Sequence, residues 1–142
     1  MKTKLLLLLT FLIYVNTYAQ FGSQQIITTN ANQATSVYAT DIDGDGDMDA
    51  LSASQDDDKI AWYENTDGQG NFGSQQIITT NADKAISVYA IDIDGDGDMD
   101  VLSASQYDNK IAWYENTDGQ GNFGSQRYSV LLIVHSKITK LN

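Results

Sequence analysis

Two identical acidic segments hold the residues of this chain whose types and spacing could do chemistry. Each reads Asp-Ile-Asp-Gly-Asp-Gly-Asp-Met-Asp, at residues 41–49 and again at residues 92–100. Five carboxylates within nine residues repel one another unless a cation lies among them. Oxygen donors at alternating positions suit Ca²⁺, which takes about six to eight of them, and glycine permits the sharp turn that wraps a chain around an ion. Each segment is therefore predicted to be a calcium-binding loop.

The alternating spacing gives every aspartate of these loops a role. Side-chain oxygens are predicted from the first, third, fifth and ninth positions and a main-chain carbonyl from the seventh, whose own side chain then points to solvent. The alternative is an ion-free acidic surface turn, which two copies of the same alternation disfavour because clustered charge is costly. The predicted ligands are Asp41, Asp43, Asp45, Asp49 and the carbonyl of Asp47, and in the second copy Asp92, Asp94, Asp96, Asp100 and the carbonyl of Asp98.

The residues that flank the acidic loops separate them from the EF-hand pattern. An EF-hand loop needs a bidentate glutamate at its twelfth position and a helix on either side. The twelfth position is Ser52 in the first copy and Ser103 in the second. The flanks are β-branched, aromatic or small residues without a helical stripe, which favours strands. Each loop is predicted to join the two strands of a hairpin.

Residues 1–19 read as a secretory signal peptide. Lys2 and Lys4 precede an apolar run over residues 5–15, and Thr17 and Ala19 place small residues where a signal peptidase reads them. The apolar run is well short of the roughly twenty residues that span a bilayer, so no membrane span remains after cleavage. The chain contains no cysteine. We expect a secreted or cell-surface protein that begins near Gln20.

The charge of the chain excludes some classes of partner. Its formal net charge is −11, and loss of Lys2 and Lys4 with the leader makes this −13, because all nineteen acidic residues lie beyond residue 40. A chain this acidic lacks the positive surface that nucleic acid or anionic lipid requires. Neither is expected as a partner.

A repeat of 51 residues organises the chain. Phe21-Gly-Ser-Gln recurs at Phe72 and begins again at Phe123, which divides the chain into a repeat over residues 20–71, a second over 72–122 and a divergent third start over 123–142. Self-similarity of this kind constrains the fold class before any local pattern does. The first two repeats differ at seven positions: Asn32/Asp83, Gln33/Lys84, Thr35/Ile86, Thr40/Ile91, Ala50/Val101, Asp56/Tyr107 and Asp58/Asn109.

Each repeat contains four short strand candidates separated by turn signals. Four antiparallel strands in a repeat of this length describe a β-propeller blade. The predicted fold class is all-β, with two tandem four-stranded β-propeller-type blades of an incomplete propeller. Residues 21–28 would be the outer strand of a preceding blade, and residues 56–58 a solvated turn. The strand candidates of the first repeat are residues 37–42, 50–54, 59–64 and 72–79.

These motifs together resemble a known family. Asp-x-Asp-Gly-Asp-Gly-x-x-Asp before an apolar strand, with Ile-Ala-Trp-Tyr-Glu-Asn and Asp-Gly-x-Gly-x-Phe downstream, is similar to the FG-GAP/VCBS repeats, which include the calcium-binding blades of integrin α-subunit propellers. The resemblance covers residues 21–126. It implies a blade whose first hairpin loop binds structural calcium, in extracellular adhesion, recognition or polysaccharide-associated proteins.

The chain departs from this family in the number of its blades. Propellers of this kind close with about seven blades, whereas this chain has two complete repeats. Two blades cannot close a ring, so one flank of each blade and the strand edges stay open. We expect self-association through the open blade faces, either as a head-to-tail ring of several chains or, for a fragment, as aggregate or loosely ordered monomer.

The sequence changes character after Gln126. The expected Gln-Ile-Ile-Thr-Thr-Asn gives way to Arg127 and a hydrophobic run, and the tail contains two lysines and no acid. Two interpretations stay open: a substituted outer strand over residues 130–134, or the product of a truncated or frame-shifted reading frame. His135 is the sole histidine and has no predicted ligand or base role.

No catalytic constellation is legible in the sequence. There is no nucleophile beside a base, and the clustered acids are assigned to calcium. Trp62-Tyr63 and Trp113-Tyr114 could be sugar-stacking platforms, but aromatic residues in blade strands are usually core, which we favour. The sequence predicts a non-enzymatic secreted module that binds an extracellular protein or glycan, or a fragment of one. The alternative is an accessory propeller of a secreted polysaccharide-degrading enzyme.

Overall fold

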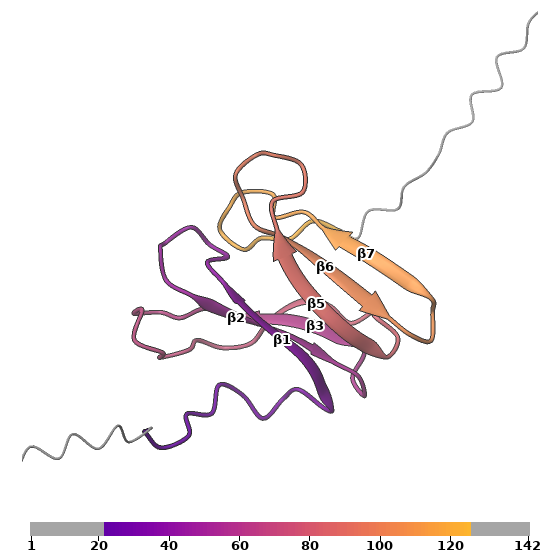
Figure 1. Ribbon diagram of the computed structural model, residues 1–142, viewed down its shortest axis with the longest axis horizontal. Coiled ribbons are helices and arrows are strands. Elements are labelled where there is room, and N and C mark those ends of the chain that lie inside the picture. The colour runs from indigo at the N-terminus through magenta and orange to yellow at the C-terminus, as the bar shows by residue number, and fades with distance from the viewer. Residues whose placement is uncertain (1–21, 126–142) are drawn as a thin grey trace, which may run out of the picture.

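The computed structural model describes residues 22–125, which form seven strands in two antiparallel sheets (Figure 1). The predicted all-β fold class is confirmed. No helix in the described range is long and apolar enough to cross a membrane. The first sheet contains β1 (Ala34–Thr40), β2 (Asp49–Ser54), β3 (Lys59–Tyr63) and β4 (Gln76–Thr79), and the second contains β5 (Ala85–Ile91), β6 (Asp100–Ser105) and β7 (Lys110–Tyr114).

Both sheets follow chain order, with β1-β2-β3-β4 in the first and β5-β6-β7 in the second. The pairing repeats with the sequence: Leu51 is opposite Trp62 in the first sheet, and Leu102 is opposite Trp113 in the second. The first repeat therefore supplies β1, β2 and β3 of the first sheet, and the start of the second repeat supplies its fourth strand, β4, an arrangement consistent with consecutive blades of an incomplete propeller. The predicted signal peptide, the outer strand predicted over residues 130–134 and His135 lie outside the described residues.

Some strand boundaries differ from the prediction. β1 begins at Ala34 and ends at Thr40, whereas residues 37–42 were expected. Ala34 pairs with Ser54, and a bulge lies between Ala34 and Ser36. The strand therefore begins earlier than predicted because β2 pairs with these residues, not because of their own preference for strand. The other end stops where the acidic loop begins.

β4 is shorter than the strand predicted over residues 72–79. Phe72 forms only an isolated bridge with Asn65, which closes the turn between them, and regular pairing with β3 begins at Gln76. The glycine-rich turn therefore uses residues that the sequence pattern placed in the strand.

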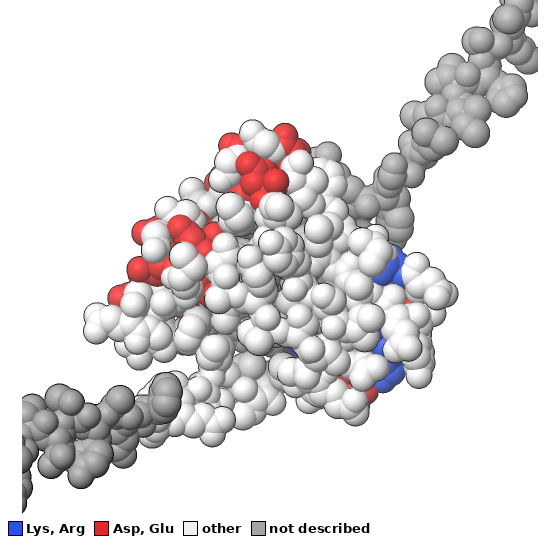
Figure 2. Space-filling view, viewed as in Figure 1, with Lys and Arg blue, Asp and Glu red and all other residues white. Residues whose placement is uncertain are grey.

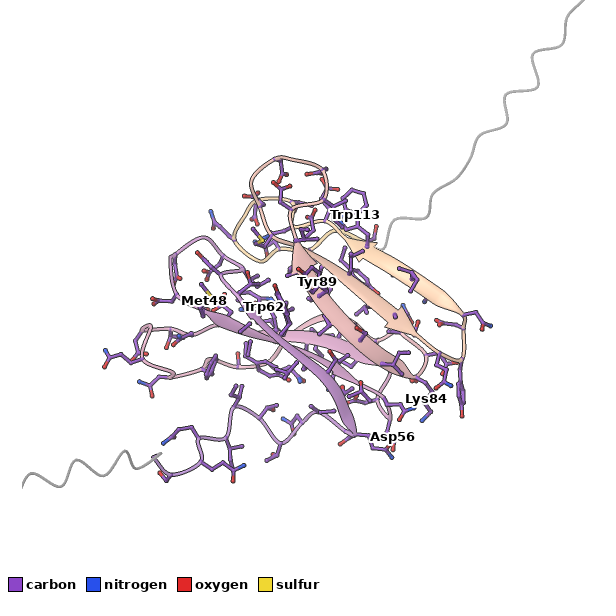
Figure 3. The ribbon with its side chains drawn as sticks, in the orientation of Figure 1. Met48, Asp56, Trp62, Lys84, Tyr89 and Trp113 are labelled. Carbon is purple, nitrogen blue, oxygen red and sulfur yellow. The ribbon has the colours of Figure 1, made fainter. Side chains whose placement is uncertain are left out.

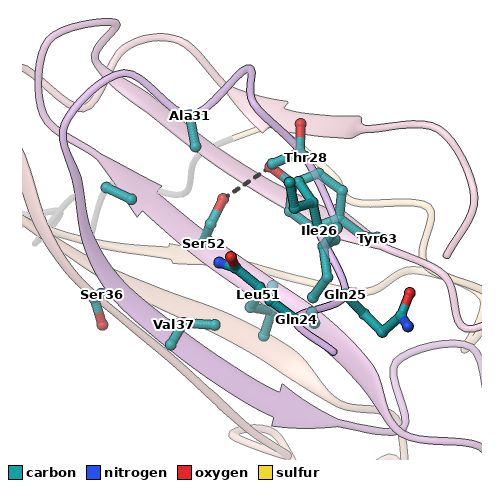
Figure 4. A pocket seen from close by; sticks show the side chains of 13 residues that line it. Gln24, Gln25, Ile26, Thr28, Ala31, Ser36, Val37, Leu51, Ser52 and Tyr63 are labelled. Atoms are coloured by element: carbon teal, nitrogen blue, oxygen red, sulfur yellow. Dashed lines mark hydrogen bonds between the residues drawn. The ribbon is translucent and has the colours of Figure 1, made fainter. Parts of the chain in front are cut away.

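The strand predicted over residues 21–28 is not formed in its described part, residues 22–28. Residues 25–28 have the same sequence as β4, Gln-Ile-Ile-Thr, yet only β4 has β3 beside it in the described structure. Residues 25–28 instead line a hollow over the first sheet, next to Ala50 and Tyr63 (Figure 4). The two copies differ in secondary structure because only one has a strand to pair with, not because of their local sequence.

The two sheets pack face to face through one shared core. Tyr89 of β5, labelled in Figure 3, is in ring contact across the interface with Tyr38 of β1, and their ring centroids are 4.7 Å apart. The prediction that Trp62, Tyr63 and Tyr114 are core residues is confirmed, because each is almost fully buried, whereas Trp113 is half-buried. Other buried members of the shared core are Ile42, Leu51, Ile60, Val88, Ala90, Val101 and Ala112.

Charged side chains divide between the two ends of the molecule. Acidic side chains cluster at one end, and lysines lie at the opposite end (Figure 2). The lysines are paired there: Lys59 with Asp57 at 2.8 Å and Lys84 with Asp56 at 2.7 Å. The turn predicted over residues 56–58 is confirmed as the β2–β3 connection, and lysines pair with its Asp56 and Asp57 at the end remote from the acidic loops.

Candidate metal centre

The acidic loops are the β1–β2 and β5–β6 hairpin connections, as the sequence predicts. Thr40 pairs with Asp49 at the base of the first loop, and Ile91 pairs with Asp100 at the base of the second. Within the first loop Gly44 and Gly46 have φ of 76° and 96°, a left-handed conformation that glycine adopts without steric cost. The last predicted ligand of each loop, Asp49 or Asp100, is therefore the first residue of the strand that follows the loop, β2 or β6.

Three of the predicted ligands in each loop come together. Asp41, Asp43 and Asp49 each place one carboxylate oxygen within 4.8 Å of the others. The second loop brings together Asp92, Asp94 and Asp100 in the same way. Three convergent carboxylate oxygens are a donor set for a hard cation such as Ca²⁺. The residues present therefore fit the ion that the sequence predicts.

Asp49 is the most firmly held of the three and is 1% exposed. Its Oδ2 accepts a hydrogen bond from the amide of Ile42 at 2.9 Å, and its Oδ1 accepts one from the amide of Asn65 at 2.8 Å. Asp100 accepts the equivalent bonds from Ile93 and Asn116, at 3.2 and 2.9 Å. Each of these buried carboxylates ties its acidic loop to the turn that follows the third strand.

Asp41 shapes the loop from its beginning. Its Oδ1 accepts a hydrogen bond from the Gly44 amide at 2.8 Å, and its Oδ2 accepts one from the Gly46 amide at 3.0 Å. Asp92 holds Gly95 and Gly97 in the same way, at 2.7 and 3.1 Å. Each carboxylate oxygen has a second lone-pair direction, so these amide bonds leave capacity for a cation. The fold of the loop is thus set by one of its own predicted ligands.

The fifth position does not join the group of three. The Oδ1 of Asp45 accepts a hydrogen bond from the Asp47 amide at 2.8 Å, and that of Asp96 accepts one from the Asp98 amide at 2.9 Å. Both side chains are exposed. Neither Asp45 nor Asp96 is among the carboxylates whose oxygens converge in the described structure.

The seventh position differs from its prediction. The carboxylate of Asp47 was expected to face solvent, but it packs against Gly68, where a Cβ would lie 2.4 Å from its Oδ1. Asp98 and Gly119 repeat this contact, also at 2.4 Å. The lack of a side chain at Gly68 and Gly119 therefore makes room for these aspartates. The glycine of the Asp-Gly-x-Gly motif could have indicated a close contact at this turn. Spacing along the chain does not show that the contact is with the acidic loop.

Burial and mutual repulsion both act on these acids. Burial raises the pKa of Asp43, and the charges of Asp45 and Asp41 add to the rise. Burial also raises the pKa of Asp49, against the lowering effect of its two amide hydrogen bonds. A raised pKa means that the ionised form is disfavoured where it stands. A cation among the oxygens would reverse that penalty.

The first loop is also tied to the second sheet. The side-chain amide of Asn116 donates a hydrogen bond to the carbonyl oxygen of Ile42 at 2.9 Å and is fully buried. The Oδ1 of the same side chain accepts a hydrogen bond from the Gly121 amide at 3.2 Å. Sequence reasoning gave Asn116 no role, because its contact lies in the other repeat.

Repeated antiparallel sheets whose first hairpin loop carries a convergent carboxylate group define a class of β-propeller-like repeat proteins. The FG-GAP-like repeat family matches the chain over residues 44–103 and 92–133, which together exceed half of its length. The chain belongs to this family, and the resemblance drawn from its motifs is confirmed. No curated protein and no solved structure matches it.

Proposed function

We propose that this chain is a secreted, non-catalytic module that binds Ca²⁺ in its two acidic loops and uses the stabilised blades to bind an extracellular protein or glycan. One observation carries the calcium proposal: Asp41, Asp43 and Asp49 converge within 4.8 Å, and the second loop repeats the group. Membership of the FG-GAP-like family supports the extracellular setting.

The chain's own residues divide the work of binding. Asp41 holds the turn of the loop, and Asp49 fixes the loop to the sheet. Asp43 is held less tightly, because the hydrogen bond that it accepts from the Asp45 amide is long at 3.3 Å. A bound calcium ion would supply the positive charge that lets all three stay ionised at close range. The role of such an ion is structural.

Thermal unfolding with and without calcium tests the metal proposal. An ion that binds only the folded loop stabilises it by about 2.7 kcal/mol per site at a hundredfold excess over its Kd. Calcium should therefore raise the melting temperature, and calorimetric titration should count two ions per chain. A melting temperature that EDTA leaves unchanged would sink the calcium proposal.

Two double variants separate ligands from bystanders. Asp43→Ala with Asp94→Ala should abolish the response of the melting temperature to calcium. Asp47→Ala with Asp98→Ala removes the same charge from the same loops but should keep the response, because only the carbonyl is assigned to the ion. If the first variant still responds to calcium, the ligand assignment is wrong even though the metal binds.

Secretion and ligand binding need their own measurements. The exported protein should begin at Gln20, which mass spectrometry of the medium fraction can show, and retention of Met1 would count against export. A glycan array and an extracellular-protein panel, each probed in calcium with a turnover assay on every hit, test the binding role. Conversion of a bound glycan into product would contradict the non-catalytic proposal.

A further inference from the structure

Four of the seven differences between the repeats lie at the contact between the two sheets. In each of these four pairs, one member makes a polar contact with the other repeat. Elsewhere the repeats are almost identical, so differences that gather at one contact indicate a requirement of that contact. The four pairs are Gln33/Lys84, Thr35/Ile86, Asp56/Tyr107 and Asp58/Asn109.

Lys84, the residue before β5, reaches the turn that joins β2 to β3. Its ammonium lies 2.7 Å from a carboxylate oxygen of Asp56, and the two residues are labelled close together in Figure 3. Its main-chain amide donates a hydrogen bond to Oδ1 of Asp58 at 2.9 Å. One lysine residue of the second repeat is therefore held by two acids of the first.

The equivalent residues cannot make this contact in the opposite direction. The first repeat has Gln33 where the second has Lys84, and the Gln33 side-chain amide donates a hydrogen bond to Asp56 of its own sheet. The second repeat has Tyr107 and Asn109 where the first has its two acids, and neither is charged. The Lys84 ammonium also lies 6.0 Å from the centroid of the Tyr107 ring. The first repeat thus supplies only the acids of this contact, and the second supplies only the base.

The acid that both turns share is paired within its own sheet. Asp57 pairs with Lys59 at 2.8 Å, and Asp108 pairs with Lys110 at the same distance. These pairs are present in both sheets and so do not distinguish them. Only the additional acids of the first turn are directed to the other repeat.

Thr35 adds an uncharged contact in the same direction. Its hydroxyl has two carbonyl acceptors, that of Ala85 at the start of β5 at 2.8 Å and that of Ala53 in its own sheet at 3.2 Å. The second repeat has Ile86 at this position, which has no hydroxyl to donate. A strand that followed the second sheet would therefore not receive this hydrogen bond.

We propose that these residues form a specificity contact that fixes the order of the two blades. A blade that carries the lysine docks on the acidic turn of the first blade, and the second blade has no acid at the two equivalent positions. By the same register, a copy of the first repeat placed after the second would bring Gln33 to Tyr107 and Asn109, with no ion pair. The contact therefore discriminates between blades of nearly identical sequence, because their docking free energies differ. Its residues are Thr35, Asp56, Asp58 and Lys84.

A double-mutant cycle in the full chain tests the ion pair. Asp56→Tyr and Lys84→Gln each introduce the residue that the other repeat has at that position, so both turns keep residues that the chain already folds there. In urea unfolding, the two changes should be non-additive by about two- to fivefold in the equilibrium constant, the range of a partly exposed ion pair. The coupling should shrink at about 1 M salt.

The matched control combines Asp56→Tyr with Lys59→Gln. Lys59 lies at the same end of the molecule, but its ion-pair partner is Asp57. This second cycle should be additive. Additivity in the first cycle would overturn the proposal.

An exchange of residues between the repeats tests the order itself. The exchange leaves the composition and the net charge unchanged. It also keeps the contacts within each sheet, because the Gln33–Asp56 pair and the Lys84–Tyr107 pair trade places. The polar contact between the sheets is lost. The six substitutions, made together, are Gln33→Lys, Lys84→Gln, Asp56→Tyr, Tyr107→Asp, Asp58→Asn and Asn109→Asp.

The exchanged chain should unfold with an equilibrium constant about two- to tenfold larger than that of the unmodified chain, because an ion pair and a charge-assisted hydrogen bond are lost. Exchange of Asp58 and Asn109 alone should have a smaller effect, since asparagine can still accept the hydrogen bond from the Lys84 amide. Equal unfolding constants for the fully exchanged and unmodified chains would overturn the proposal, even if the double-mutant cycle shows coupling.

Discussion

Replacing Gly121 with alanine should destabilise the chain more than the same change at Gly70, although both glycines occupy one position of the repeat. Both have positive φ, 77° and 88°. They differ in what a methyl group would meet: the buried indole of Trp62 at 2.3 Å for Gly121, and open space for Gly70. The difference between the two variants therefore measures the contact between the sheets.

The magnitude follows from two separable terms. An L-residue in the left-handed region costs about 1–2 kcal/mol, which both variants carry. Overpacking against a rigid, buried side chain adds about 1–3 kcal/mol, which only Gly121→Ala carries because Trp62 is 2% exposed. Gly70→Ala should thus lose about 1–2 kcal/mol of unfolding free energy and Gly121→Ala about 2–5 kcal/mol.

Urea unfolding in saturating calcium, at a protein concentration where the chain is monomeric, compares the variants. Trp62→Leu supplies a check, because the loss from Gly121→Ala should be smaller in that background, giving a non-additive double-mutant cycle. Equal losses at Gly70 and Gly121, or strict additivity with Trp62→Leu, would refute the assignment of this glycine to the packing between sheets.

Three further measurements follow from the same structure. In the monomer Ile60→Ala should cost about 2–5 kcal/mol, whereas Ile111→Ala should change the unfolding free energy by no more than about 0.5 kcal/mol. Asp45→Ala should leave two calcium ions bound in a calorimetric titration. Loss of one ion would show that the Asp45 side chain is a ligand after all. The hydrogen bond from Lys110 holds the pKa of Asp108 below its usual range, so its stabilising effect is complete above about pH 4 and is lost as pH falls through the folded-state pKa. The urea midpoints of wild type and Asp108→Asn should accordingly converge on acidification, and a gap that widens would contradict the sign.

The sequence predicts much of the candidate metal centre because local spacing controls it. Asp41 and Asp43 are close along the chain, and a glycine-rich loop brings Asp49 back to them. The link from Asp49 to the Asn65 amide lies beyond such reasoning, because it depends on how β2 and β3 pair. The same limit explains Asp47, whose neighbour Gly68 belongs to a different turn.

The fold could be predicted as a class but not at every strand. The repeat and its turn signals indicate sheets of antiparallel strands, and both sheets are present. Residues 25–28 and β4 have the same four residues, yet one is irregular and the other is a strand. No method based on local preference can distinguish them, since the difference lies in which edge each can reach.

The hydrogen bond from Asn116 to the Ile42 carbonyl makes two loops of identical sequence thermodynamically unequal. Ile42 is 1% exposed beneath the second sheet, whereas its counterpart Ile93 is 41% exposed. By the repeat, the residue equivalent to Asn116 that would donate to the Ile93 carbonyl belongs to a further blade. Binding of the proposed ion to the first loop and docking of the two sheets should therefore be coupled. Each should raise the equilibrium constant of the other by the same factor. The first loop should bind calcium more tightly than the second. Asn116→Ala should bring the two affinities together in a calorimetric titration, and equal affinities in the unmodified chain would show that the two loops are not coupled to their surroundings.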